Sequence, residues 1–367
     1  MKVKFNNLFL QNKPILKDTK KIFVNTFKNS KFVAGNEIDK FEKNFSKILG
    51  SNYCVSVANG TDALIIALKC LGVNYGDEVI TSAHTWVSTA GAIVAVGAKP
   101  VFVDTDKFFS IDPDKIERKI SRKTKVIIPV HLYGQSCDMD KILKIAKKNN
   151  LKIIEDCAQA HLSKYKNKYL GNFGDVGTFS FFPAKNLGSI GDAGAIVCKK
   201  KNLYQLLKRY KNHGSIKKNI HETFGINSRM DSIHAAFLNK KLKYLKKFNS
   251  RRNKIAKIYY SKLKDNKNIE LPNLRIKSKH TFHQYVIKVK KNRDRLIEYL
   301  TKKNIEVGIH YPKMVINLKP YKKNINKKEF KNCLKYENLI LSLPIHPFLT
   351  YKEIFFICKN INNFFKK

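Results

Sequence analysis

Short apolar runs alternate with longer segments of helical spacing between residues 36 and 198. The runs that predict strands are 53–57, 77–81, 100–103, 125–130, 151–155, 178–182 and 195–198. The segments that predict helices are 36–49, 63–71, 86–96, 113–120 and 138–148. This alternation predicts an α/β fold, with a mostly parallel sheet covered by helices on both faces. Because ligands bind beyond the carboxyl ends of such strands, polar residues at those ends are the first candidates for a site.

Outside this region the pattern is less regular. Residues 1–35 are polar and irregular apart from an amphipathic piece at 17–27, and a helix at 202–211 is followed by a long helix from Asp231 toward Tyr260. The remaining segments predict a strand at 283–289, a helix at 293–303 and a terminal helix, with no regular alternation. We therefore expect a large α/β domain over residues 1–248 and a smaller α+β domain over residues 249–367.

Positive charge dominates the composition. The chain has 72 Lys and Arg against 28 Asp and Glu, a formal charge of +44. Such an excess can indicate a nucleic acid or an anionic membrane surface as the partner. Here the lysines are spread along the whole chain, often on polar helix faces such as that of Lys240, Lys243 and Lys247. We therefore expect a bias in composition and no specific nucleic-acid partner, while attraction to anionic substrates such as nucleotides stays open.

The cysteines and the apolar runs indicate the compartment. Seven cysteines without a Cys-x-x-Cys pair favour reduced thiols. His280 and His283 lack an acidic or cysteine neighbour, so we expect structural or substrate-facing roles for them and no metal site. The apolar runs are far shorter than the roughly 20 residues that cross a bilayer. The N-terminus is a poor signal peptide. We expect a cytoplasmic protein without a membrane span.

One lysine differs from the others in its surroundings. Lys185 lies in the stretch 177–194, which joins two apolar runs through Pro183 and several glycines, and its neighbours are aromatic, small or amide residues. A lysine partly removed from water has a lowered pKa and can act as a nucleophile or form a Schiff base. The alternative is a loop lysine that reaches solvent.

Two other strand ends carry candidate polar groups. Asp156 follows a run that should be buried, where a carboxylate needs a cationic or N–H partner, unless it caps a helix. Gly60 and Thr61 follow the strand at 53–57 and begin a helix. Free N–H groups at such a turn can bind an anion, although a generic strand-to-helix turn is the alternative.

Five separated motifs, taken together, resemble one family. They are Asn59-Gly60-Thr61-Asp62, Trp86, Glu155 to Ala160, Ser180 to Gly188 and Asn227 to Asp231. In this order, and over nearly the full chain, they resemble the DegT/DnrJ/EryC1/StrS family of pyridoxal-phosphate sugar aminotransferases. The resemblance implies the aspartate aminotransferase fold (type I) with a seven-stranded sheet, and a homodimer with its active sites at the subunit interface.

The resemblance also implies roles for single residues. Lys185 would form the Schiff base with pyridoxal 5'-phosphate and carry the proton between cofactor and substrate. Asp156 would pair with the protonated pyridine nitrogen and keep the ring an electron sink. Trp86 would stack on the ring, and Gln159 would approach the ring hydroxyl.

The same resemblance assigns the phosphate contacts. Gly60, Thr61 and Ser180 would hold the phosphate, and Asn227 would reach the phosphate of the neighbouring subunit's cofactor. His310 and Tyr311 are candidates for substrate contact.

The sequence around Lys185 bears on the substrate. Members that aminate C-4 of nucleotide sugars tend to have Ser-Phe-His there, whereas this chain has Ser180-Phe181-Phe182. It resembles the C-3 aminating group, which acts on dTDP-3-keto-6-deoxyhexoses, with some relatives acting on UDP-3-keto sugars. The chain departs from the family pattern at four positions where sugar contacts are expected: Leu162, Ser163, Met314 and Ile316.

The resemblance implies a ping-pong transamination. An amino donor, with L-glutamate expected, converts the cofactor to pyridoxamine phosphate, which then aminates C-3 of a dTDP-3-keto-6-deoxyhexose. The product is a dTDP-3-amino-3,6-dideoxyhexose for surface glycans of the O-antigen, lipopolysaccharide or S-layer type. The alternatives are a UDP-linked 3-keto acetamido sugar as substrate and a non-catalytic regulator that binds the cofactor. Sugar dehydratases of the family have His at the lysine position, and Lys185 speaks against that reaction.

Overall fold

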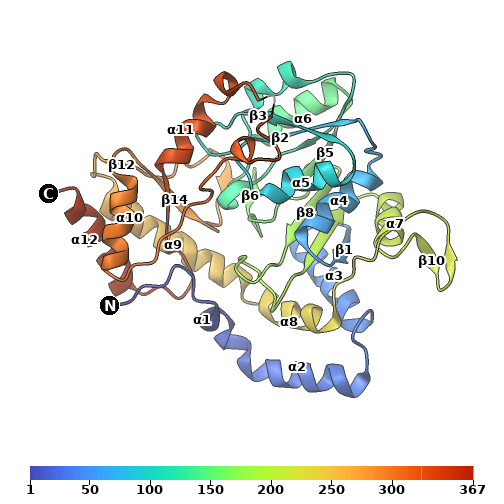
Figure 1. Ribbon diagram of the computed structural model, residues 1–367. Helices are drawn as coiled ribbons and strands as arrows, with labels where there is room; N and C mark the ends of the chain where they lie inside the picture. The colour runs from blue at the N-terminus through green and yellow to red at the C-terminus, as the bar shows by residue number, and fades with distance from the viewer. Residues whose placement is uncertain (324, 367) are drawn as a thin grey trace.

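A seven-stranded sheet forms the centre of the molecule (Figure 1). The computed structural model describes residues 1–323 and 325–366. In spatial order the strands are β1 (Tyr53–Val57), β9 (Gly194–Cys198), β8 (Val176–Ser180), β5 (Lys152–Asp156), β4 (Thr124–Ile128), β2 (Glu78–Ser82) and β3 (Lys99–Val103). The strand β9 runs antiparallel to both neighbours, and the other pairs are parallel. The predicted α/β fold with a mostly parallel seven-stranded sheet is confirmed.

Helices cover both faces of this sheet. Successive residues of a strand point to opposite faces, so Ile153 and Ile154 of β5 belong to different hydrophobic clusters. One cluster packs against α3 (Asn36–Leu49), α6 (Met139–Lys148) and α8 (Ser232–Leu242). The other packs against α4 (Gly60–Cys70), α5 (Val87–Ala95) and α7 (Lys201–Tyr210). Burial on both faces explains why the strands are apolar throughout.

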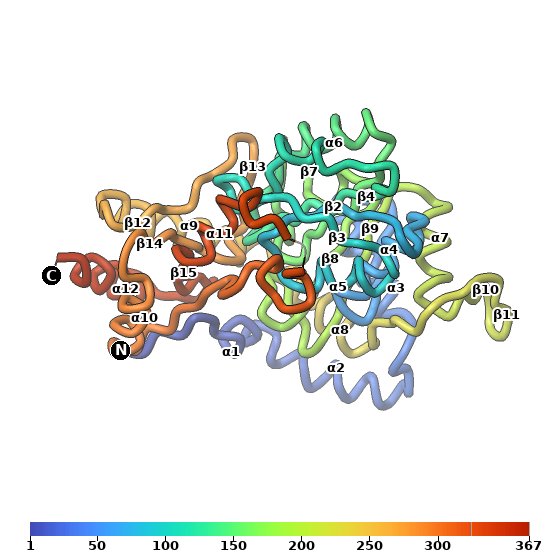
Figure 2. Tube along the Cα trace, turned by 45° about the horizontal axis from the view of Figure 1, so that its top comes forward, coloured from blue at the N-terminus to red at the C-terminus, as the bar shows by residue number. Residues whose placement is uncertain are grey.

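The C-terminal region has a hydrophobic core of its own. Its elements are α9 (Leu245–Leu263), β12 (Ile269–Glu270), β14 (Tyr285–Val289), α10 (Arg293–Lys302), α11 (Lys331–Leu339), β15 (Ile340–Leu343) and α12 (Tyr351–Phe364). The strands form a sheet in the order β12-β14-β15. Val3 joins this core and bridges to Ile305, so both chain ends lie on this side of the molecule (Figures 1 and 2). The domain boundary between residues 248 and 249 stays a prediction, and it falls inside α9.

Smaller elements complete the chain. They are α1 (Leu8–Asn12), α2 (Leu16–Asn29), β6 (Lys164–Tyr165), β7 (Lys168–Tyr169), β10 (Ser215–Lys217), β11 (Ile220–His221), β13 (Ser278–Lys279) and the 3₁₀ turns η1 (Lys13–Ile15), η4 (Leu132–Gly134), η5 (Val315–Asn317) and η6 (Lys327–Glu329). The hairpin β10–β11 projects from the body beyond α7 (Figures 1 and 2). In the part of the chain that the structure describes, no helix combines the length and the apolar character needed to cross a bilayer.

Three predicted segments differ from the structure. The helix predicted at 113–120 is two 3₁₀ turns, η2 (Pro113–Lys115) and η3 (Glu117–Lys119), and the chain is already extended at Ile120. The long helix toward Tyr260 is divided into α8 and α9 at residues 243–244. The N-terminal region, predicted to be irregular, contains α1, and the amphipathic piece at 17–27 lies in α2.

Candidate active site

A cavity of about 730 Å³ opens beyond the carboxyl ends of the central strands. The residues predicted for the site that line it are Gly60, Thr61, Trp86, Asp156, Gln159, Ser180, Lys185, His310 and Tyr311. Asn227 is the exception. It is exposed, pairs with Asn212 and is not in the wall of this cavity.

A tight loop between β8 and β9 presents Lys185 to the cavity. The loop is closed by backbone hydrogen bonds from Phe181 N to Ala193 O (2.7 Å) and from Ser189 N to Phe181 O (2.7 Å). A β-carbon on Gly188 would lie 2.1 Å from the Pro183 carbonyl oxygen, so this position requires glycine. The Lys185 amine makes no hydrogen bond to any residue that the structure describes. Burial lowers its pKa to about 8, although Asp156 acts in the opposite direction. The lysine is therefore directed into the cavity, and not into open solvent.

The lowered pKa predicts how Lys185 reacts with an aldehyde. Only the neutral amine is a nucleophile, and its fraction rises as the pH passes through about 8. The rate at which the apoenzyme attaches pyridoxal phosphate should therefore rise between about pH 7 and pH 9 and then level off. Stopped-flow absorbance across this range measures it. A rate that still rises steeply above pH 10 would indicate an ordinary exposed lysine.

Asp156 lies at the end of β5, below the same cavity. Its Oδ2 accepts a hydrogen bond from Thr89 Oγ1 (2.9 Å), and its Oδ1 accepts one from Ala158 N (3.1 Å). No helix begins here, which excludes the helix N-cap as the explanation for this residue. Burial raises the pKa of Asp156, against the effect of these hydrogen bonds and of Lys185. A buried carboxylate of this kind favours a cationic ligand in the cavity.

The N-terminus of α4 forms a second wall of the cavity. Asn59 caps the helix, because its side chain accepts a hydrogen bond from Asp62 N (2.8 Å). The N–H groups of Gly60 and Thr61 are in the first turn, where no intrahelical acceptor is available. A β-carbon on Gly60 would lie 2.7 Å from Ser180 Cβ, so only glycine lets the helix approach this strand end. The result is a small anion-binding cradle with a hydroxyl at Ser180.

Aromatic and amide groups form the third wall. Gln159 Oε1 accepts a hydrogen bond from Tyr133 N (2.7 Å), and Gln159 Nε2 donates to the Tyr311 hydroxyl (2.8 Å). The Tyr311 ring lies 5.1 Å from the ring of Trp86, which is half exposed. His310 Nδ1 is hydrogen-bonded to Ser342 Oγ (2.8 Å). A planar ring could therefore lie against Trp86 with its polar edge toward Gln159.

Further residues line the cavity besides the predicted site residues. Thr89, Arg252 and Phe5 line the cavity, and His283 does so as well. Phe5 stacks on His310 with ring centroids 5.6 Å apart, which places the N-terminal segment at the cavity. Of these four, the sequence singled out only His283, for which a structural or substrate-facing role was expected.

The four positions that depart from the family pattern lie behind the cavity wall. Leu162, Met314 and Ile316 are buried in hydrophobic clusters. Ser163 Oγ is buried and hydrogen-bonded to Gly134 O (2.8 Å). None of the four lines the cavity. Their side chains are used in packing within this chain, and their influence on the choice of sugar stays a prediction.

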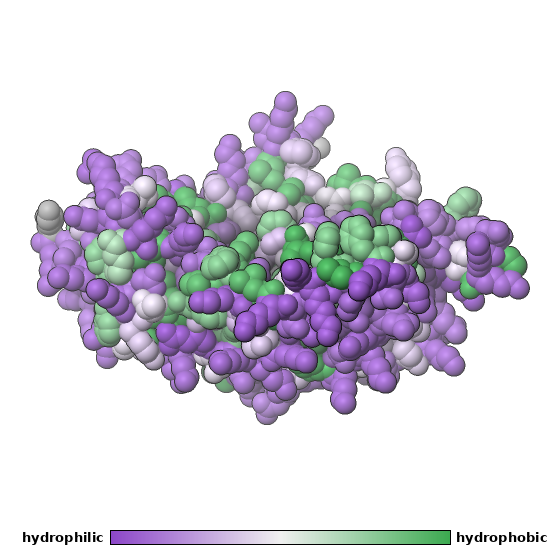
Figure 3. Space-filling view, turned by 90° about the horizontal axis from the view of Figure 1, so that it is seen from below, coloured by the Kyte–Doolittle hydropathy of each residue, from purple (hydrophilic) through white to green (hydrophobic). Residues whose placement is uncertain are grey.

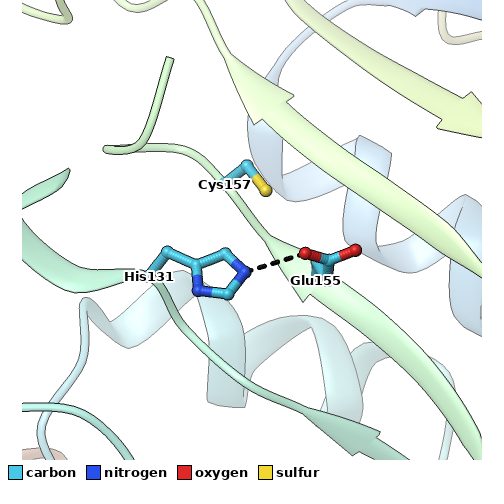
Figure 4. A group of neighbouring side chains, drawn as sticks. All are labelled: His131, Glu155 and Cys157. Carbon is cyan, nitrogen blue, oxygen red and sulfur yellow. Dashed lines mark hydrogen bonds and ion pairs between the residues drawn. The ribbon is translucent and has the colours of Figure 1, made fainter. Parts of the chain in front are cut away.

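His131, Glu155 and Cys157 form a buried group of metal-ligand types within 4.8 Å of one another (Figure 4). His131 Nδ1 accepts from Cys137 N (3.1 Å), so its Nε2 carries the proton and donates to Glu155 (3.0 Å). Glu155 also accepts hydrogen bonds from the backbone N–H groups of residues 171, 173 and 174. Burial opposes ionisation of Glu155, but these donors hold its pKa below the usual value. They occupy the lone pairs that a metal ion would need, so the group fixes the chain behind the site.

The chain resembles known proteins over almost its full length. Residues 14–362 match the DegT/DnrJ/EryC1/StrS aminotransferase family. The chain is 40% identical to the dTDP-3-amino-3,6-dideoxy-alpha-D-galactopyranose transaminase of Aneurinibacillus thermoaerophilus, over 91% of each chain. It is 36% identical to the UDP-2-acetamido-2-deoxy-3-oxo-D-glucuronate aminotransferase of Pseudomonas aeruginosa, over 92% of this chain and 93% of that protein.

A solved structure has the same fold. The S. venezuelae protein DesV superposes with a TM-score of 0.97 at 32% identity, over 100% of this chain and 99% of that chain. The predicted type I fold is thereby confirmed. The chain belongs to the DegT/DnrJ/EryC1/StrS aminotransferase family, whose members depend on pyridoxal phosphate.

Proposed function

We propose that this enzyme transfers an amino group from L-glutamate to C-3 of a dTDP-3-keto-6-deoxyhexose. The product would be a dTDP-3-amino-3,6-dideoxyhexose, a donor for surface glycans. The observation that carries the proposal is that Lys185 and Asp156 line one cavity with the cradle at Gly60. The substrate is proposed from the 40% identity to the A. thermoaerophilus transaminase and from Phe182 and Pro183 before the lysine.

The cavity fits the cofactor that the family uses. Gly60, Thr61 and Ser180 would hold the phosphate, because the cradle offers N–H and hydroxyl donors in a space that a β-carbon would fill. Asp156 would hold the proton on the pyridine nitrogen, and such a cation would remove the penalty that burial places on its carboxylate. Bound pyridoxal phosphate supplies an electron sink for the carbon that loses or gains a proton.

The chain's own groups would bind and orient the reactants and move the proton. With a pKa lowered to about 8, the Lys185 amine can accept and return a proton near neutral pH. Thr89 and Ala158 fix the orientation of the Asp156 carboxylate. Trp86 and Tyr311 would confine the planar ring and limit the access of water from the mouth.

A UDP-linked 3-keto sugar is the second candidate substrate, favoured by the 36% identity to the P. aeruginosa enzyme. One assay separates the two. The enzyme is incubated with L-glutamate that carries isotope-labelled nitrogen and with either keto-sugar nucleotide, and the products are examined by mass spectrometry. Label in the dTDP-sugar supports the proposal, and label only in the UDP-sugar supports the second candidate.

We also infer that the active enzyme is a homodimer to which Asn227 contributes across the interface. Asn227 is exposed and lies outside its own cavity, close to the hairpin β10–β11. Figure 3 shows apolar side chains gathered among polar ones on the side of the molecule where α2 lies. The exposed apolar residues of α1, α2 and the turn that follows are Phe9, Leu16, Phe23, Val24, Phe27, Phe32 and Val33. Such a surface is typical of an interface.

Mixing the K185A and N227A variants tests this arrangement. If each site uses Lys185 of one subunit and Asn227 of the other, a mixed dimer of K185A and N227A contains one intact site and one site that lacks both. Re-equilibrating equal amounts should restore about a quarter of the wild-type activity, since half of the dimers are mixed. Activity no greater than that of the N227A protein in the same mixture would indicate that both residues act within one subunit.

A further inference from the structure

Arg252 is a buried cation in the wall of the cavity. It lies on α9 and is only 2% exposed. Its Nη1 donates hydrogen bonds to the carbonyl oxygens of Phe282 (3.4 Å) and Ile345, while its Nε has no hydrogen-bond partner. No Asp or Glu of the described chain forms an ion pair with it. Two carbonyl groups therefore orient the guanidinium, but no acidic residue in the described part of the chain compensates its charge.

This arrangement is costly without a ligand. A guanidinium does not give up its proton under ordinary conditions, and a buried charge without a counter-ion is strongly unfavourable. Burial lowers the pKa of Arg252 to about 9. The nearby Lys241 is also buried, and its amine donates to the Gly188 carbonyl (2.8 Å) and not to an acid. Lys241 is not in the cavity wall, so Arg252 is the buried cation there that favours an anionic ligand.

A histidine side chain is not an anion, so the neighbouring His283 cannot be the counter-ion of Arg252. His283 does connect Arg252 to the loop that carries Lys185. Asn186 Nδ2 donates to Asn249 and Thr281, so Asn186 Oδ1 is an acceptor, and His283 Nδ1 (3.2 Å) must donate to it. Burial, and then the charges of Lys185 and Arg252, hold the pKa of His283 well below its usual value. Arg252 is hydrogen-bonded to Phe282 O, next to His283, and His283 is hydrogen-bonded to Asn186, next to Lys185. Both Arg252 and Lys185 line the same cavity.

We propose that Arg252 binds the carboxylate of the amino donor. A carboxylate accepts two parallel hydrogen bonds from one guanidinium, and the described residues engage only Nη1 of Arg252, which is in the cavity wall. The α-carboxylate of an amino acid is one carbon from its amino group, so it must lie near Lys185 when nitrogen is exchanged there. The sugar diphosphate has no such constraint. The inference rests on the proposed function, because it presupposes an amino acid as donor.

The test follows the two half-reactions of the holoenzyme separately. The donor half is the conversion of the pyridoxal form by L-glutamate, and the acceptor half is the reoxidation of the pyridoxamine form by the keto-sugar nucleotide. Binding of glutarate, an unreactive dicarboxylate, is measured by calorimetry with its neutral diamide as the control. The variants are R252M, R252K and R251M. Arg251 is the matched control, because it is the adjacent arginine on α9 and donates to Leu349 O (2.8 Å) outside the cavity.

R252M should weaken glutarate binding and raise the half-saturating concentration of L-glutamate by roughly 10- to 100-fold, the range for lost hydrogen bonds to a charged group. R252K keeps the charge but loses the two parallel donors of the guanidinium. Its glutarate affinity and its half-saturating concentration of L-glutamate should lie between those of R252M and the wild type. The acceptor half-reaction of R252M and both halves of R251M should be unchanged. Diamide binding should be equally weak in all variants.

Two results would overturn the inference. Equal losses in both half-reactions of R252M and R252K would show that Arg252 only supports the fold, through Phe282 and Ile345. A loss confined to the acceptor half would show that it binds the sugar nucleotide instead. If the wild type binds glutarate but does not react with L-glutamate, the proposed donor is wrong, and the glutarate affinity of R252M still decides the role of Arg252.

Discussion

Lys185→Ala should produce a protein that binds pyridoxal phosphate without a covalent bond and transfers amino groups at least about 10³-fold more slowly. The variant loses both the amine that would attach to the cofactor and the group that would carry the proton. Borohydride reduction followed by peptide mapping measures the attachment, and single-turnover absorbance measures the rate.

The mapping has an internal control. Lys241 is also buried, with a pKa lowered to about 8, so low pKa alone does not select the site. Lys241 donates to Gly188 O behind the loop, whereas Lys185 faces the cavity. The reduced adduct of the wild type should map to Lys185 and be absent from K185A. An adduct on Lys241, or cofactor still attached in K185A, would refute this assignment.

Asp156→Asn should keep the cofactor attached to Lys185 but slow both half-reactions by about 10²- to 10³-fold. Asparagine cannot be an anion, so the proton on the pyridine nitrogen would lose its partner, and breaking a buried ion pair costs about 3–5 kcal/mol. An increase of about 1.36 kcal/mol in the activation free energy slows a reaction about tenfold.

Thr89→Val is the matched control for this prediction. It leaves the carboxylate in place but removes the hydrogen bond to Oδ2 (2.9 Å). Its expected effect is about tenfold, as for a single hydrogen bond to a charged group. If D156N kept rates close to those of T89V, Asp156 would not be the partner of the ring nitrogen.

The central sheet and the residues at its strand ends could be predicted because their signals are local. A continuous apolar run indicates a strand buried on both faces, and Asp156 and Ser180 each end such a run. Lys185 was recognisable because its sequence neighbours are not lysine-rich. The resemblance to a family then gave roles that the residues alone could not give.

Other features depend on tertiary contacts and left no local signal. Arg252 is one of two adjacent arginines on a basic helix, and its burial, its place in the cavity wall and its contacts with Phe282 and Ile345 distinguish it from Arg251. Phe5 reaches the cavity because the N-terminal segment pairs with the distant residue Ile305. The sequence does not mark the division between α8 and α9, since it has no Gly or Pro there. Residues 243 and 244 both keep helical backbone angles.

The most direct test of the proposed function is to prepare the enzyme in its pyridoxamine form, without free donor, and add single keto-sugar nucleotides. We predict that a dTDP-3-keto-6-deoxyhexose restores the pyridoxal spectrum in one turnover and yields the C-3 amino sugar. A spectrum that stays unchanged with dTDP-3-keto-6-deoxyhexoses would contradict the proposed function.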